Sequence, residues 1–230
     1  MVVLPPRPPK YDRIWCFLPE EGGDGDAVRV GMLPLGTGLQ VDLLTLQSGV
    51  WVVRLTAALN PPETLPKFRG MLPPVRGKIF MLTNSLKILR LDFAAANISV
   101  IQLPDRVRTA NFKFSRGEDV FLVHAEGHLL SMWRLATNGN DTNDWVLVYD
   151  NIHVREACDR TENVMVIAVD DTAEFVFLGL EASGVVICMH LRSGVEKVEQ
   201  VSEMTIPQYM SFVRITPFKM VWPPTFPALY

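Results

Sequence analysis

The chain has 230 residues, of which 48% are hydrophobic and 20% charged, and it contains 17 prolines. This composition is too apolar for a disordered chain and too rich in proline for a helical bundle, so it predicts a folded, β-rich protein. The formal net charge is −3 and no basic run occurs, which argues against the electrostatic surface of nucleic-acid and anionic-membrane binders.

The first ten residues, MVVLPPRPPK, carry prolines where a secretory signal has a continuous apolar stretch. We therefore expect an intracellular protein, cytoplasmic or nuclear, in which the sequons at Asn97 and Asn140 are unused and Cys16, Cys158 and Cys188 are free thiols. Segment 4–10 has the P-x-x-P spacing of SH3 ligands, although a linker into the first strand is the simpler interpretation. The longest apolar runs, such as VMVIAV at 164–169, are far shorter than the ~20 residues that span a bilayer.

Short runs of Val, Ile, Leu and Phe alternate with turn residues along the chain, which predicts strands rather than helices. We expect four copies of a unit of four strands. The strands fall at 14–18, 28–33, 39–46 and 51–55; at 67–72, 77–83, 86–92 and 98–103; at 108–114, 119–125, 128–135 and 145–149; and at 163–169, 174–180, 184–192 and 195–201.

The copies recur at a nearly fixed period. Their third strands end near Leu46, Leu91, Leu135 and Leu191, at spacings of 45, 44 and 56 residues. Four antiparallel strands in about 45 residues are typical of a β-propeller blade, whereas a sandwich of sixteen strands would not explain the period. We predict an all-β fold, a partial or four-bladed propeller over residues 11–230, with blade-like repeats at about 14–55, 67–103, 108–150 and 163–202 after a proline-rich segment 1–10.

Two stretches near the C-terminus carry more detailed expectations. In VVICMHLR at 185–192, Val185, Ile187, Met189 and Leu191 share one face of the strand and are expected in the core. Residues 220–229, MVWPPTFPAL, hold two large aromatic residues and no charge. We expect segment 209–230 to form an extended strap whose aromatic side chains pack on the blades.

Candidate metal and catalytic residues each have a simpler structural interpretation. His124 and His128 flank a turn between two strands, and Cys188 and His190 share a strand face without a second ligand pair. His153 and Cys158 lie in a junction with Asp159 and Arg160, where a catalytic pair stays open but a structural loop is favoured. We assign no catalytic, metal or cofactor-binding residue and expect no enzyme.

Several polar loops resemble known sites only in part. PEEGGDGD at 19–26 lacks the alternation and closing glutamate of a calcium loop, and GTG at 36–38 is not a dinucleotide motif. GND at 139–141 lies in the polar tip TNGNDTND. We expect the partner-binding surface in loops 19–26, 136–144 and 155–162, with the contact residues unknown.

Four stretches, taken together, resemble a known family. They are FLPEEGGDGDAVRV, WVLVYDNIHVREAC, DDTAEFVFLGLEASGVVICMHLRSGVEKVEQV and VRITPFKMVWPPTFPAL, in this order between Tyr11 and Leu229. The chain is similar to the grass F-box proteins that carry a C-terminal F-box-associated β-propeller. The closing VWPPTFPAL is the most specific part of this resemblance.

The resemblance implies a protein-interaction module. In that family the F-box binds the Skp adaptor of a cullin-type ubiquitin ligase, and the propeller selects the protein to be ubiquitinated. Nothing before Tyr11 resembles an F-box, so the resemblance implies a Skp partner only if an F-box lies upstream, and the chain is expected to be a fragment or a shortened copy. The alternatives are a family copy without a ligase role and a propeller-based hydrolase.

Overall fold

The computed structural model describes residues 11, 13–17, 27–35, 38–59, 67–72, 74–115, 117, 119–137, 143–154, 162–191 and 198–202. Side chains are described for all of these except 13–17, 35, 137, 143 and 198–202. The chain divides into two compact units, unit 1 (Met1–Pro104) and unit 2 (Asp105–Tyr230). In the described part of the chain, no helix has the length and apolarity needed to span a membrane.

Unit 1 contains two four-stranded sheets. Sheet A consists of β1 (Arg13–Phe17), β2 (Val28–Leu35), β3 (Gly38–Gln47) and β4 (Val50–Leu59). Sheet B consists of β5 (Phe68–Met71), β6 (Lys78–Thr83), β7 (Lys87–Asp92) and β8 (Asn97–Gln102).

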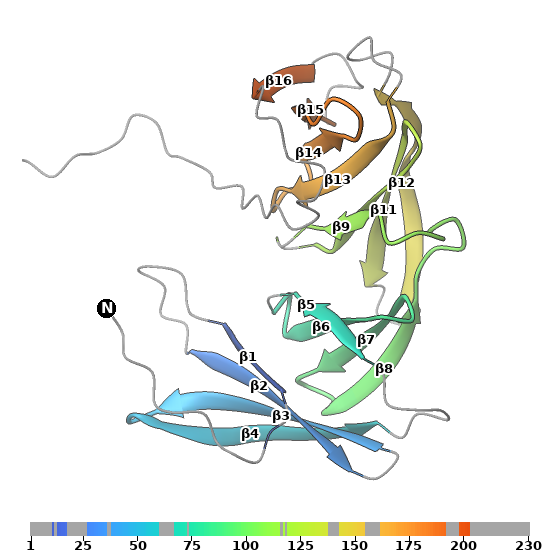
Figure 1. Ribbon diagram of the computed structural model, residues 1–230. Coiled ribbons are helices and arrows are strands. Elements are labelled where there is room, and N and C mark those ends of the chain that lie inside the picture. Colours follow the sequence, from blue (N-terminus) through green and yellow to red (C-terminus); the bar gives the residue numbers. More distant parts are fainter. Residues whose placement is uncertain are drawn as a thin grey trace, which may run out of the picture. The chain divides into compact units, whose positions relative to one another are not determined.

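Unit 2 repeats this arrangement. Sheet C consists of β9 (Phe112–Phe114), β10 (Phe121–Glu126), β11 (Leu129–Thr137) and β12 (Asn143–His153). Sheet D consists of β13 (Val164–Val169), β14 (Phe175–Leu180), β15 (Val186–His190) and β16 (Val198–Ser202). In every sheet the strands lie in their order along the chain (Figure 1), and neighbouring strands are antiparallel. The prediction of an all-β chain of four-stranded antiparallel blades is confirmed.

The strand bounds differ most from expectation in sheet C. β9 covers only three residues, Phe112–Phe114, against a predicted strand at 108–114. β12 has eleven residues, against a predicted strand at 145–149. It pairs with the nine residues of β11 through two register shifts, so two residues of β12 lie in bulges, which residue propensities alone do not reveal.

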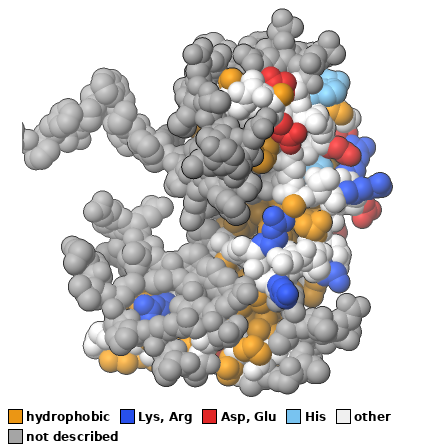
Figure 2. Space-filling model, in the orientation of Figure 1, with side chains coloured by type: hydrophobic (Ala, Val, Ile, Leu, Met, Phe, Trp, Pro, Cys, Tyr) orange, Lys and Arg blue, Asp and Glu red, His pale blue; other side chains and the backbone are white. Residues whose placement is uncertain are grey.

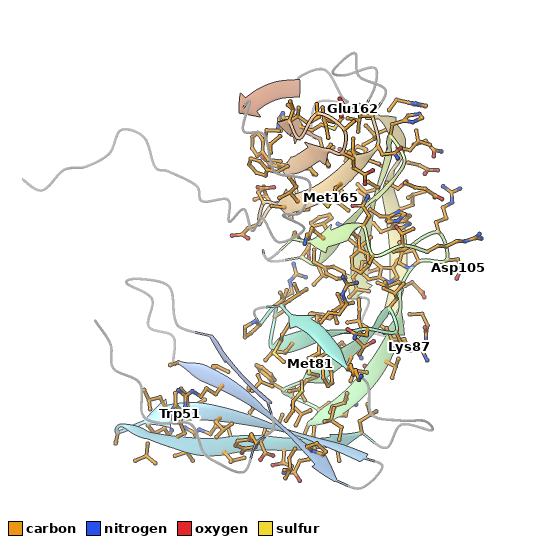
Figure 3. The ribbon with its side chains drawn as sticks, in the orientation of Figure 1. Trp51, Met81, Lys87, Asp105, Glu162 and Met165 are labelled. Atoms are coloured by element: carbon orange, nitrogen blue, oxygen red, sulfur yellow. The ribbon has the colours of Figure 1, made fainter. Side chains whose placement is uncertain are left out.

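Each unit has a core between its two sheets. In unit 1 alternate residues of β2, β3, β6 and β7 face this core, among them Val30, Val41, Ile79 and Met81, all fully buried (Figure 3). The period of two follows from the pleat, which points successive side chains to opposite faces of a sheet.

The core of unit 2 forms in the same way between sheets C and D. Its members include Val123, Leu130, Met132, Val176 and Leu178. Ile187, Met189 and Leu191 are buried in it and Val185 packs against it. The predicted core face of segment 185–192 is therefore confirmed.

The side chain of Asn111, the residue directly before β9, joins the two sheets of unit 2. The Asn111 amide nitrogen donates to the carbonyl oxygens of Ala125, at 3.1 Å, and Val164, at 2.8 Å. Its oxygen accepts the backbone N–H of Val166 at 2.8 Å. Asn111 therefore connects β10 of sheet C with β13 of sheet D by three hydrogen bonds.

A buried carboxyl group lies on the other face of sheet A. Asp42 of β3 is 1% exposed, and one of its oxygens accepts the Tyr11 hydroxyl at 2.7 Å. The other oxygen accepts the Gln40 amide and the Thr56 hydroxyl, each at 2.8 Å. Three donors from separate parts of unit 1 thus meet on one side chain, which compensates for removing it from water.

Replacing Gly31 by alanine tests the packing of Tyr11 on β2. A methyl group at Gly31 would lie 2.7 Å from two ring carbons of Tyr11, so the ring must move away from Asp42. We expect the free energy of unfolding to fall by about 1 to 3 kcal/mol, as for other overpacked sites, measured by urea denaturation. The matched control is Gly70, where an added methyl group would meet no other atom within 4 Å, and an equal effect of Gly70→Ala would contradict this packing.

Several expectations fall outside the described residues. These are the segment 1–10, the loop 19–26, the motif 139–141, Cys158 with its neighbours Asp159 and Arg160, and the strap 209–230. Loops 136–144 and 155–162 are described only at their ends. The domain limits at residues 11 and 230 stay predictions.

Candidate functional site

A polar cavity of about 330 Å³ lies on unit 2. It is formed by strands β10, β11 and β12 and by the segment between Asp105 and β9, which leads into sheet C. Asp105 is labelled in Figure 3. Its lining residues are Arg106, Arg108, His124, Glu126, Leu129, Ser131, Trp133 and Asn151. Figure 2 shows basic, acidic and histidine side chains on one side of unit 2.

The cavity lies on the face of sheet C that points away from the core of unit 2. Alternation explains this position, since Val123, Ala125, Leu130 and Met132 point into the core and the residues between them point to the cavity. His124 on β10 lies directly opposite Ser131 on β11. The pleat therefore brings residues of two strands to one site.

A β-bulge in β12 adds further polar groups to this face. Leu130 pairs with Ile152 and Met132 with Tyr149, so two residues, Asp150 and Asn151, lie opposite Ser131 alone. Tyr149 and Ile152 both pack on the core, which leaves both bulge residues for the cavity face. Asn151 has a φ of 53°, a left-handed conformation that asparagine adopts more readily than most residues.

The bulge positions an ion pair. Arg106 Nη1 lies 2.7 Å from both carboxylate oxygens of Asp150, and Ser131 Oγ donates to the same carboxylate at 3.2 Å. The hydrogen bond from Arg106 lowers the pKa of Asp150 below its usual value. The pair fixes Arg106 against β12, so this guanidinium is already compensated.

His124 forms the inner wall of the cavity. Its side chain is 3% exposed, its Nε2 lies 3.0 Å from the Thr109 hydroxyl, and its ring lies 6.3 Å from that of Trp133. Burial lowers the pKa of His124 from its ordinary value of 6.5, while the nearby Glu126 carboxylate opposes the shift. The imidazole is therefore neutral at pH 7 and adds no positive charge to the cavity.

The lowered pKa of His124 predicts a pH dependence of stability. Below pH 6.5, the ordinary value, the unfolded chain binds a proton at this residue more readily than the folded one, so stability falls as the pH falls. We expect the urea midpoint to decrease from pH 7.5 to 5.5, and His124→Gln to reduce this decrease. An unchanged decrease in the variant would show that other groups cause it.

The other histidines and cysteines of the sequence analysis lie elsewhere. His128 contacts His153 with ring centroids 5.9 Å apart, and the His190 ring stacks on Phe175 at 4.7 Å. Cys188 is partly buried and is not part of a disulfide. Among the described residues, no three His, Cys, Asp or Glu side chains come together as metal ligands.

Sequence analysis did not single out most of the cavity residues. Arg106 lies before the strand predicted at 108–114 and Arg108 at its start, where nothing marks a site, and Asp150 and Asn151 reach the site only through the bulge. The one available signal was the change from apolar to polar residues in YDN at 149–151, within a strand otherwise rich in valine and leucine.

Four consecutive antiparallel sheets of four strands, each joined in sequence order, define a protein of the β-propeller class. A family model supports this class in detail. The family described as "F-box protein AT5G49610-like, beta-propeller" matches residues 1–226. The chain belongs to this family of F-box protein propellers, and the resemblance to F-box-associated propellers is confirmed.

No curated protein matches the chain. Among solved structures it is similar to a protein of Bacteroides uniformis provisionally named a 6-phosphogluconolactonase, with 14% identity and a TM-score of 0.41, over 88% of this chain and 57% of that one. It is also similar to a prolyl endopeptidase, with 12% identity and a TM-score of 0.38, over 77% and 26% of the two chains. A Lactobacillus plantarum protein has 8% identity and a TM-score of 0.38, over 79% and 65%. The chain thus spans less than two thirds of each of these structures.

Proposed function

We propose that the chain is a non-enzymatic interaction module that selects a target protein for a cullin-type ubiquitin ligase of a plant cell, in the cytoplasm or the nucleus. The observation that carries the proposal is the match of residues 1–226 to the propeller family of F-box proteins. A Skp adaptor is a partner where the protein also carries an F-box, which is the part of these proteins that binds the adaptor.

The geometry of the cavity supports a binding role rather than hydrolysis. His124 and Ser131 lie opposite each other on β10 and β11, as a general base and a nucleophile would have to lie. However, the His124 imidazole bonds to Thr109 and the Ser131 hydroxyl bonds to Asp150. Both side chains thus have other partners, and the serine hydroxyl donates to the Asp150 carboxylate instead of to the His124 imidazole.

The residue types of the cavity also suit a protein partner. Trp133 and two arginines line it together with Leu129, and tryptophan and arginine are the residues most enriched at the energetic centres of protein interfaces. The net charge of −3 supports a protein partner over nucleic acid or an anionic membrane.

The experiment is to overexpress the full chain in plant cells and to compare protein abundances with and without a proteasome inhibitor. Residues 1–226 match a propeller, and a propeller expressed in excess by itself binds the target in competition with the ligase-bound receptor. We therefore expect at least one protein that co-purifies with the chain to accumulate, and the inhibitor to abolish the difference between expressing and control cells.

The control is a chain carrying Asp42→Ala, a substitution that disrupts unit 1 without touching the cavity. If the co-purifying proteins do not change in abundance, or change equally with the inhibitor present, the chain does not select proteins for degradation. If expression of the chain instead raises the level of a hydrolysis product and changes no protein, the propeller-based hydrolase is favoured.

A further inference from the structure

Of the two arginines that line the cavity, one is in an ion pair and the other is not. Arg106 and Asp150 neutralise each other through two contacts of 2.7 Å. Arg108, in contrast, makes no side-chain hydrogen bond or ion pair with any other described residue, and its side chain is exposed. Among the described lining residues, one guanidinium without an ion-pair partner therefore remains at a cavity with a buried aromatic wall, Trp133, which is 5% exposed.

We propose that this cavity binds a carboxylate group of a peptide segment in the target protein, with the Arg108 guanidinium as its direct partner. The inference rests on the proposed function and names the chemistry that the interaction module recognises. The carboxylate comes from an Asp or Glu side chain or from the C-terminus of the target, two sources with the same recognition chemistry.

The charge balance favours a carboxylate over a phosphoryl group. The guanidinium presents two parallel N–H groups that match the two oxygens of a carboxylate. A phosphoryl group carries about −1.5 to −2 charges at pH 7, whereas Arg108 is the one basic side chain among the described lining residues that no ion pair engages. Glu126 lines the same cavity and is exposed, so it repels a dianion more strongly than a monoanion.

The site is also held in place before a ligand binds. The Arg108 N–H donates to the Arg106 carbonyl at 3.0 Å, and Arg106 is fixed by the bulge residue Asp150. The short segment that presents Arg108 is therefore anchored to sheet C at its start. This restrains the backbone that carries Arg108, so binding orders the exposed side chain but not the segment itself.

The uncharged residues of the cavity can contact the part of the peptide next to its carboxylate. Leu129 and Trp133 offer apolar surface beside the polar end groups of Ser131 and Asn151. The methylene groups of a glutamate side chain, or the residue that precedes a C-terminus, would pack on this surface while the carboxylate reaches Arg108.

The test is a titration of the full chain, labelled with ¹⁵N, with short blocked peptides. The probes are N-acetyl-Gly-Ala-Glu-Ala-Gly-amide, the same peptide with Gln or phosphoserine in place of Glu, and N-acetyl-Gly-Ala-Ala-Ala-Gly with a free C-terminus. The readout is the indole N–H signal of Trp133, identified by its loss in Trp133→Phe. We expect one or both carboxylate peptides, but not the Gln peptide, to shift this signal saturably.

Arg108 variants decide the assignment. Arg108→Ala is expected to weaken binding roughly tenfold to a hundredfold, and Arg108→Lys, which keeps the charge but loses the paired N–H groups, less than that. The matched control is Arg134→Ala, an exposed arginine of β11 outside the cavity, which should leave binding unchanged. Glu126→Gln should strengthen binding of the Glu peptide and admit the phosphoserine peptide.

The inference is overturned if neither carboxylate peptide shifts the Trp133 signal, if Arg108→Ala and Arg134→Ala bind equally well, or if the phosphoserine peptide binds the unmodified chain more tightly than the Glu peptide. Its failure is distinct from failure of the proposed function. If a chain with Arg108→Ala still binds and stabilises its target, the cavity is not the site of target binding. If peptides bind through Arg108 but no partner responds to the proteasome inhibitor, the carboxylate site is supported and the ligase role is contradicted.

Discussion

Asp42→Ala is expected to lower the free energy of unfolding by about 3 to 5 kcal/mol, because three donors lose their acceptor and each buried group left without a partner costs about 1 to 3 kcal/mol. The substitution leaves the Tyr11 hydroxyl, the Gln40 amide and the Thr56 hydroxyl without their common acceptor. Urea denaturation gives the overall change. Hydrogen exchange of the amides of β2, β3 and β4 shows whether the loss is confined to unit 1.

Two further variants separate the network from the cavity left by a smaller side chain. Asp42→Asn keeps one oxygen acceptor and the volume, so we expect it to cost less than Asp42→Ala. Tyr11→Phe removes one donor and leaves the other two, so about 1 kcal/mol is expected. If Asp42→Ala costs no more than Tyr11→Phe, the carboxyl group does not organise this face of sheet A.

Asn111→Asp is expected to destabilise unit 2 by about 3 kcal/mol or more, because a carboxylate then faces two carbonyl oxygens that now accept hydrogen bonds from an amide. The change conserves shape and volume, so packing is not the cause. Asn111→Ala removes the same bonds without adding a charge and should cost less. The measurement is hydrogen exchange of the amides of Ala125 and Val166 together with urea denaturation.

The pH dependence of the aspartate variant provides its control. The buried carboxylate can relieve the repulsion by binding a proton, so the difference from the asparagine form should shrink as the pH is lowered. Equal stability of Asn111→Asp and the unchanged chain at pH 7 would show that Asn111 does not join sheets C and D.

The sequence was sufficient to predict the strands and their grouping, and the reason is visible in β6 and β7. Both strands are short apolar runs between turn residues, and this local pattern carried the information. Ile79 and Met81 face the core of unit 1, and Phe80 between them is buried as well. The four repeats could be recognised because each sheet uses neighbouring strands in sequence order. Long-range pairing was not needed to find them.

The polar sites could not be predicted because they depend on contacts between distant residues. Tyr11 and Asp42 are separated by 31 positions, and Asn111 and Val164 by 53. Arg106 and Asp150 meet across 44 positions. A local sequence pattern does not predict side-chain contacts between residues so far apart in the chain. The bulge that places Asp150 also interrupts the alternation from which side-chain direction would otherwise be inferred.

The bulges of β12 have a consequence for how such a chain can diverge. Because β12 is two residues longer than its partner β11, deleting a single codon at Asp150 or Asn151 would leave the strand paired while removing one polar group from the cavity face. A new combination of polar groups is therefore one in-frame insertion or deletion away, and no core residue has to change.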